Sequence, residues 1–333
     1  MHFGWGNSYL LLPIRVDDMN ETNLLNVDSM VWSELCDLAP ARLTVSDTGL
    51  PHVFLNELIS KHIYKHGVLD LRELVINTAL EWNVLEEVIT DLKKESLVEI
   101  KGPASNTSAL RYSLTERGIM FAKNAISKDG YIGYAPIIIA EYRDLVMSQS
   151  VHSEIIDTNR IDEIFSDVIV KQDMLDQLGA AINSNRASFI YGPPGSGKSY
   201  LCNKLSQTLS NHVLIPHAIY VDGTVVQLYD PAVHNAIVYE NNSGVLKQGL
   251  DQRLVLCTRP VVISGGELTI DQLEIQCDTV THQYHAPLQL KANNGIYLID
   301  DLGRQIISPK ELFNRWIVPL ETHKDHEPGS AIR

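Results

Sequence analysis

The chain has 333 residues, of which 44% are hydrophobic and 20% are charged, a composition typical of a globular protein with room for about two domains. Its formal net charge of −14 disfavours nonspecific binding to a polyanion such as duplex DNA. Four cysteines without pairing spacing suit a reducing cytoplasm better than a disulfide scaffold. We find no basic leader and no apolar span of membrane length, so we expect neither a signal peptide nor a membrane helix.

Residues 1–50 show no clear hydrophobic period, and we expect an irregular arm there. Residues 51–127 show a sharper pattern. Apolar residues at helical spacing predict three helices, the first ending at Gly67 and the second starting with a capping box at Asp70. Two short apolar stretches, 97–100 and 110–114, predict strands on either side of a polar turn, and Thr115 is suited to cap a last helix.

Three helices followed by a β-hairpin resemble a winged-helix domain, an α+β fold. The resemblance implies that the third helix could lie in the major groove of DNA. In this chain, that helix (83–96) carries more carboxylates than lysines, so it is poorly suited to a phosphate-lined groove. Two uses of the domain stay open. The charge favours contacts with a protein over contacts with DNA.

Residues 128–160 predict a connector, with a turn-rich start and then one apolar face. The second domain spans 161–333. It contains Gly192-Pro193-Pro194-Gly195-Ser196-Gly197-Lys198-Ser199, which matches the phosphate-binding P-loop pattern G-x-x-x-x-G-K-[ST]. The apolar stretch 187–191 predicts a buried strand before the loop, and leucines at helical spacing predict a helix from Tyr200 after it.

Glycines let successive backbone amides of such a loop point inward at phosphate, and the following helix adds the positive end of its dipole. Lys198 is expected to reach the β- and γ-phosphates, and the Ser199 hydroxyl is expected to bind Mg²⁺. Tyr200, the next residue, is also assigned to the nucleotide site. The loop therefore predicts binding of a nucleoside triphosphate.

A second motif follows at residues 295–301, where Ile296-Tyr297-Leu298-Ile299 precedes Asp300 and Asp301. Four apolar residues predict a strand buried on both faces, whose end delivers a carboxylate beside the P-loop. We assign Asp300 to Mg²⁺ and Asp301 to the water that attacks the γ-phosphate. Residues 218–223 predict the second strand of this sheet, and residues 260–269 predict an inserted loop with a possible partner surface.

These two motifs resemble those of bacterial AAA+ ATPases, and residues 286–295 resemble the phrase before Walker B in members with a helix-two insertion. The resemblance implies a three-layer αβα P-loop NTPase that uses ATP and Mg²⁺. It also implies that Ile169 and Val170, in the entry segment 165–170, line the adenine pocket, although core packing explains them equally well. Asp301 stands where many AAA+ enzymes carry Glu, and helicase-loader-type ATPases end this strand with two Asp in the same way.

The sequence departs from this family after the second motif. AAA+ proteins continue with a strand that bears a polar sensor residue, a further strand and a helical lid, and we find no candidates for them before Arg333. We therefore expect an incomplete sheet, a truncated domain, and no full-strength ATP hydrolysis by this chain alone. A homo-oligomeric ring is expected only if the missing C-terminal part completes the domain.

The favoured hypothesis is a cytoplasmic AAA+ ATPase, not bound to a membrane, that hydrolyses ATP to ADP and phosphate while it remodels or assembles an unidentified protein partner. Lys198 and Asp301 would be its catalytic residues. Two alternatives stay open: a nucleotide-gated regulator that binds DNA through the winged helix, and a nucleotide sensor without turnover.

Overall fold

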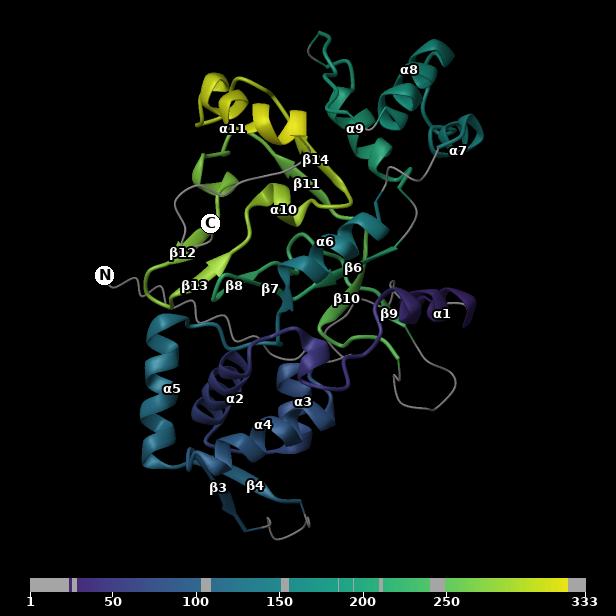
Figure 1. The fold of residues 1–333 in the computed structure, drawn as a ribbon. Helices are drawn as coiled ribbons and strands as arrows, with labels where there is room; N and C mark the ends of the chain where they lie inside the picture. Colours follow the sequence, from purple (N-terminus) through teal and green to yellow (C-terminus); the bar gives the residue numbers. More distant parts are fainter. Residues whose placement is uncertain are drawn as a thin grey trace, which may run out of the picture.

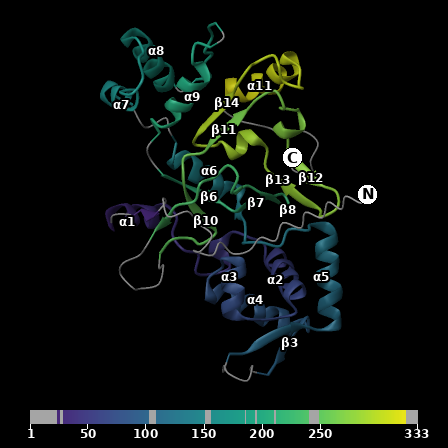
Figure 2. The same ribbon diagram turned by 180° about the vertical axis from the view of Figure 1, so that it is seen from behind.

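The computed structural model describes residues 24–25, 29–102, 109–150, 156–184, 186–193, 195–209, 212–239 and 249–322. Figures 1 and 2 show a helical unit at one end, a central layer of strands, and a third region in which helices stand beside a short parallel sheet. Within the described ranges, no helix is both long enough and apolar enough to cross a membrane.

The helices of the helical unit form where the sequence predicts them. They are α2 (His52–His66), α3 (Leu71–Thr78), α4 (Trp82–Lys94) and α5 (Glu116–Lys128). The capping box of Asp70 with Glu73 starts α3, and the Thr115 hydroxyl accepts a hydrogen bond from the Gly118 amide to start α5. The predicted strands β3 (Val98–Lys101) and β4 (Arg111–Leu114) pair antiparallel, and β2 (Val68–Asp70), absent from the prediction, pairs with β4.

Two segments contain regular structure that the sequence did not predict: the arm, residues 1–50, and the connector, residues 128–160. The arm contains α1 (Ser29–Leu38) and a 3-10 turn at Ser46–Thr48; residues 1–23 lie outside the described residues. The predicted connector contains β5 (Ile137–Ile138) and α6 (Ile139–Ser148). Tyr142 and Leu145 of α6 are buried with β5 in the core of the central layer, so this connector is part of the folded body.

The central layer is a five-stranded sheet in the order β12 (Gln276–Asp278), β13 (Gln283–His285), β8 (Thr224–Gln227), β7 (Ala218–Val221) and β5. The prediction that 218–223 is the second strand of the P-loop sheet is wrong. Asp222 and Gly223 have φ of 48° and 90° and turn β7 back into β8. An Asp-Gly pair favours such a hairpin, so the sequence contained this signal.

Two shorter ladders flank this sheet. In one, β6 (His212–Pro216) pairs antiparallel with β10 (Leu254–Thr258). In the other, β1 (Leu24–Leu25) pairs in parallel with β9 (Val238–Tyr239).

The third region has strands between two groups of helices. On one side, α7 (Thr158–Ile164), α8 (Gln172–Asn183) and α9 (Lys198–Ser206) share an apolar core. On the other side lie α10 (Leu288–Lys291), a 3-10 turn at Asp271–Leu273 and α11 (Pro309–Thr322). Between them, β11 (Val261–Ser264) pairs in parallel with β14 (Ile296–Ile299). Helices therefore pack on both faces of this two-stranded parallel sheet, in an αβα arrangement.

A buried charge network joins the segment before α2 and the start of α6 to the loop before β10. Arg253, which is 1% exposed, pairs with Asp251 at 2.7 Å and with Glu141 of α6 at 3.3 Å. Its guanidinium also donates to the carbonyl oxygens of Pro136 (3.0 Å) and Thr48 (3.5 Å). One side chain thus ties together three segments that are distant in the sequence, around residues 48, 136–141 and 251–253, and two carboxylates compensate its charge.

We expect Arg253→Met to lower the free energy of unfolding by about 3–5 kcal/mol, because buried Asp251 loses its close cation, whereas half-buried Glu141 keeps Arg42 at 2.6 Å. Urea denaturation followed by circular dichroism measures the change. Arg143→Met is the matched control, since Arg143 is an exposed arginine on α6. Equal unfolding midpoints for the two variants would contradict the role assigned to the network.

Candidate functional site

The P-loop leads directly into α9. Gly195 and Gly197 have φ of 74° and 79°, the left-handed region that favours glycine, and Gly197 stands at the N-cap of α9. Pro194 lies outside the described residues. The loop turns sharply into a helix N-terminus, where unpaired amides and the helix dipole favour an anion.

The Lys198 side chain folds back over this loop. Its Nζ donates to the carbonyl oxygens of Gly192 (3.2 Å) and Pro193 (3.0 Å). The ammonium therefore lies at the loop that the sequence assigns to phosphate, with uncharged oxygens as its partners. An anion bound in the loop would meet a cation already in place.

The segment before the loop differs from the prediction. Residues 187–191 belong to no strand, and Phe189 and Tyr191 are 68% and 93% exposed. The predicted buried strand is therefore wrong. An apolar run becomes a strand only when a neighbour satisfies its amides and carbonyls, and β14 does not pair with this segment.

The acidic motif stands at the carboxyl end of β14, as the sequence predicts. The four residues of β14 are half-buried, so the prediction of a strand buried on both faces is wrong in degree. Its neighbour is β11, within the segment predicted as an inserted loop, and that prediction is wrong as well. Gly295 makes the pairing possible: a Cβ there would lie 2.0 Å from the Pro260 carbonyl oxygen.

Two observations bring the acidic motif close to the P-loop helix. Ile296, the first residue of β14, packs against the core of α7, α8 and α9. Burial, and then the charge of Asp300, raise the pKa of the Cys202 thiol on α9, one helical turn after Ser199. Within the described ranges, no hydrogen bond or ion pair joins Asp300 to Ser199 directly, and the Asp300 carboxylate accepts from the Asp301 amide at 2.9 Å.

The remaining residues predicted to bind the nucleotide differ in how far they are exposed to solvent. Ile169 is fully exposed, whereas Val170 packs against the core of α7, α8 and α9. Ser196 and Tyr200 are exposed beside the loop. The entry segment is fastened to the P-loop helix because Lys204 pairs with Asp167. The assignment of these residues to the nucleotide stays a prediction.

Sequence reasoning missed Gln305, which lies in the turn after the two acids. Its side-chain nitrogen donates to the carbonyl oxygens of Asp300 (2.7 Å) and Asp301 (3.2 Å), and Arg304 pairs with the Asp301 carboxylate at 3.3 Å. The glycine at position 303 could have predicted a tight turn here, and its φ is 97°.

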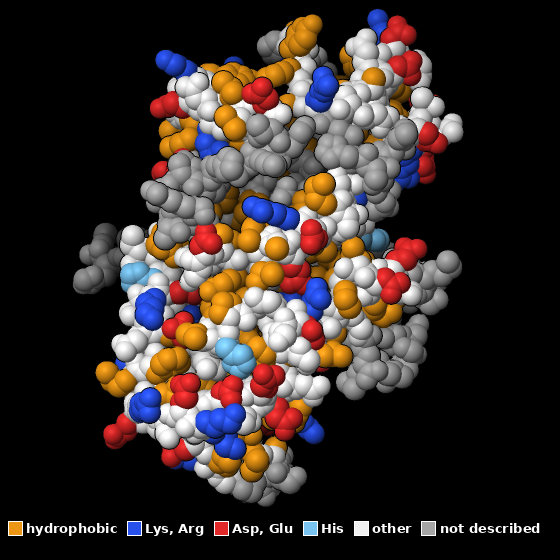
Figure 3. Space-filling model, in the orientation of Figure 1, with side chains coloured by type: hydrophobic (Ala, Val, Ile, Leu, Met, Phe, Trp, Pro, Cys, Tyr) orange, Lys and Arg blue, Asp and Glu red, His pale blue; other side chains and the backbone are white. Residues whose placement is uncertain are grey.

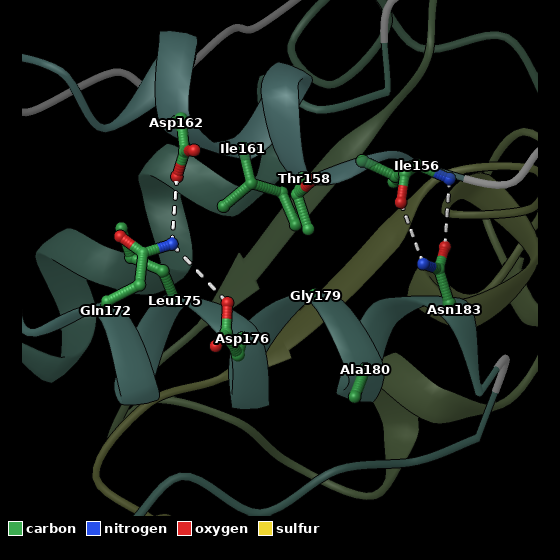
Figure 4. A pocket seen from close by; sticks show the side chains of 10 residues that line it. All are labelled: Ile156, Thr158, Ile161, Asp162, Gln172, Leu175, Asp176, Gly179, Ala180 and Asn183. Atoms are coloured by element: carbon green, nitrogen blue, oxygen red, sulfur yellow. Dashed lines mark hydrogen bonds between the residues drawn. The ribbon is translucent and has the colours of Figure 1, made fainter.

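A separate cavity of about 170 Å³ lies between α7 and α8 (Figure 4). Ile161 and Leu175 form part of its wall, and Gln172 donates to both Asp162 (3.3 Å) and Asp176 (3.4 Å). None of the residues predicted to bind the nucleotide lines this cavity. Among the side chains that the structure describes, no group of three or more His, Cys, Asp or Glu is arranged to hold a metal ion.

A family model described as RNA helicase matches residues 188–255, which span the P-loop, α9 and the strands as far as β10. The match points to a P-loop NTPase-type domain, which implies nucleotide binding and hydrolysis of a nucleoside triphosphate. It covers about a fifth of the chain. A comparison with curated proteins gave no match.

The position of Asp300 relative to α9 can be tested through Cys202. Asp300→Asn removes a nearby negative charge, so we expect a lower pKa for Cys202, more thiolate, and faster alkylation by iodoacetamide at pH 8. Peptide mass spectrometry measures the rate, with exposed Cys277 as internal reference. Asp301→Asn is the matched control and should leave the rate unchanged. Equal alkylation rates in the two variants would show that Asp300 does not lie close to the P-loop helix.

Proposed function

We propose that this chain binds ATP with Mg²⁺ and hydrolyses it to ADP and phosphate as an AAA+ ATPase that remodels or assembles a protein partner. The observation that carries the proposal is that a cationic and an anionic side chain lie near the same helix, α9. Lys198 lies over a glycine loop at the start of α9, and Asp300 acts on the same helix from the end of β14.

The residues present fit both ATP and Mg²⁺. Gly195 and Gly197 give the loop its phosphate-binding shape, and Lys198 holds the β- and γ-phosphate oxygens. The hydroxyl of Ser199 and the carboxylate of Asp300 supply oxygen ligands of the kind that Mg²⁺ prefers. When bound, the metal neutralises charge on the phosphate oxygens. Ile169 and Val170 are the proposed walls for adenine, and Tyr200 flanks the nucleotide.

Asp301 is the proposed residue for hydrolysis. Its carboxylate would accept a hydrogen bond from a water molecule and hold it in line with the γ-phosphate. The side chain is exposed and its partner is Arg304, so it is accessible to water and does not have to be released from a buried contact. Its shorter reach than Glu is consistent with slow turnover.

The parallel order of β11 and β14 and the helices on both faces support a P-loop NTPase fold, of which AAA+ is the form that we propose. The helices and antiparallel strands of the helical unit support a winged helix. Figure 3 shows Lys and Arg interspersed with Asp and Glu over this unit on the face in view. Such a mixed surface suits a protein partner better than DNA. We further propose that the chain forms a homo-oligomeric ring if a C-terminal part completes the domain.

The match to the RNA helicase model favours a second candidate, an ATPase that acts on RNA. The two are separated by measuring phosphate release at low salt with and without single-stranded RNA. Stimulation by RNA supports the second candidate, and identical rates reject it.

We expect Lys198→Ala to weaken binding of ATP by about 100-fold, because each lost hydrogen bond to a charged oxygen costs about 1.5–3 kcal/mol. Isothermal titration calorimetry measures the affinity. Lys310→Ala, at an exposed lysine of α11, is the matched control. An unchanged ATP affinity in Lys198→Ala would refute the phosphate site.

We expect Asp301→Asn to keep ATP affinity and to slow phosphate release by about a hundredfold, since an amide is a poor acceptor for the proton of the attacking water. Asp173→Asn, at an exposed aspartate of α8, serves as control. Wild-type turnover in Asp301→Asn would remove Asp301 from the mechanism. Binding without phosphate release in the wild-type chain would identify a nucleotide sensor.

A further inference from the structure

The two acids of the candidate site lie on a tight turn with an unusual backbone. Asp300 still belongs to the sheet, because its amide donates to the Ser264 carbonyl oxygen of β11 at 2.9 Å. Asp301, the next residue, has a φ of 51°, which is uncommon for a residue with a side chain. Such a backbone persists only where the surroundings hold it, and it is often found at functional sites.

The side chain of Gln305 makes three hydrogen bonds to the backbone of this turn. Its Nε2 donates to the carbonyl oxygens of Asp300 (2.7 Å) and Asp301 (3.2 Å), and its Oε1 accepts from the Gly303 amide (2.7 Å). Both ends of the amide are therefore used, and each bond goes to the backbone of the turn. The Gln305 side chain is half-buried, so these bonds are partly shielded from competition with water.

Gln305 itself stands on a fixed backbone. The next two amides, of Ile306 and Ile307, donate to the carbonyl oxygens of Gly266 and Leu268, both at 3.0 Å. Ile307 is buried with Leu268 in the core beneath α11. Gln305 thus links a rigid part of the fold to the turn that presents both carboxylates.

We propose that Gln305 is a positioning residue that orients Asp300 and Asp301 toward a nucleotide-bound Mg²⁺ and its water. The inference rests on the proposed function. Residues behind a metal ligand set its direction, and their loss commonly weakens metal binding or activity by about 10–100-fold. Gln305→Ala frees the turn to relax from the left-handed backbone at Asp301. Gln305→Glu keeps the shape but directs a carboxylate at two carbonyl oxygens.

The test compares the affinity for ATP in excess Mg²⁺ with the affinity in EDTA, by titration calorimetry on the full chain. The ratio of the two isolates the contribution of the metal. We expect both Gln305 variants to lower this ratio by about tenfold or more, with the affinity in EDTA unchanged because the P-loop is intact. Gln276→Ala should leave the ratio at the wild-type value, since Gln276 also donates to a main-chain oxygen, that of Asp271, away from the acids.

Hydrogen exchange of the nucleotide-free chain gives a second readout, in which the Gly303 amide should exchange faster in Gln305→Ala than in the wild type. A wild-type chain with the Mg²⁺-dependent gain, together with Gln305 variants that keep it, would overturn the positioning role alone. A wild-type chain without any gain would overturn both this role and the proposed function. A melting temperature within the range of the Gln276→Ala control shows that the variants are folded.

Discussion

The parallel pairing of β14 with β11 determines where the acidic side of the site stands. The two strands pair in register from Val261 with Ile296 to Ser264 with Ile299, and the Asp300 amide extends the ladder by one more bond. In a parallel pair, both carboxyl ends lie at the same edge, so the two acids that follow β14 stand beside the end of β11. A register slip by one residue would turn Asp300 to the opposite face of the sheet.

The same strand holds the two helical groups of the region together. Alternate residues of a strand face opposite sides. Ile296 packs against α7, α8 and α9, whereas Tyr297 and Ile299 pack against the core beneath α11. Phe189 and Phe313, with ring centroids 6.2 Å apart, add a contact at the surface. The position of the acids relative to the P-loop helix therefore depends on how this strand of four residues packs against both cores.

Local features of the site were predictable from the sequence, and long-range pairings were not. The helix α9 after the loop, the strand β14 and the acids at its end follow from patterns within a few residues, as do the caps at Asp70 and Thr115. Whether residues 187–191 form a strand, however, depends on which segments meet in space. The same is true of which strand pairs with β14. Hydrophobic runs at 218–221 and 261–264 are equally good strands, and composition does not say which of them pairs with β14.

The structure also shows what a bound polyanion would change. Lys198 now bonds to two uncharged carbonyl oxygens of its own loop, and no ion pair joins Asp300 to a cation in the described part of the chain. An ammonium is attracted more strongly by an anionic oxygen than by a neutral carbonyl oxygen at the same distance. A phosphate chain with a divalent cation would give Lys198 anionic partners and Asp300 a cationic one at the same time. That gain in free energy would also favour the separation of α9 and β14 at which both side chains reach the ligand.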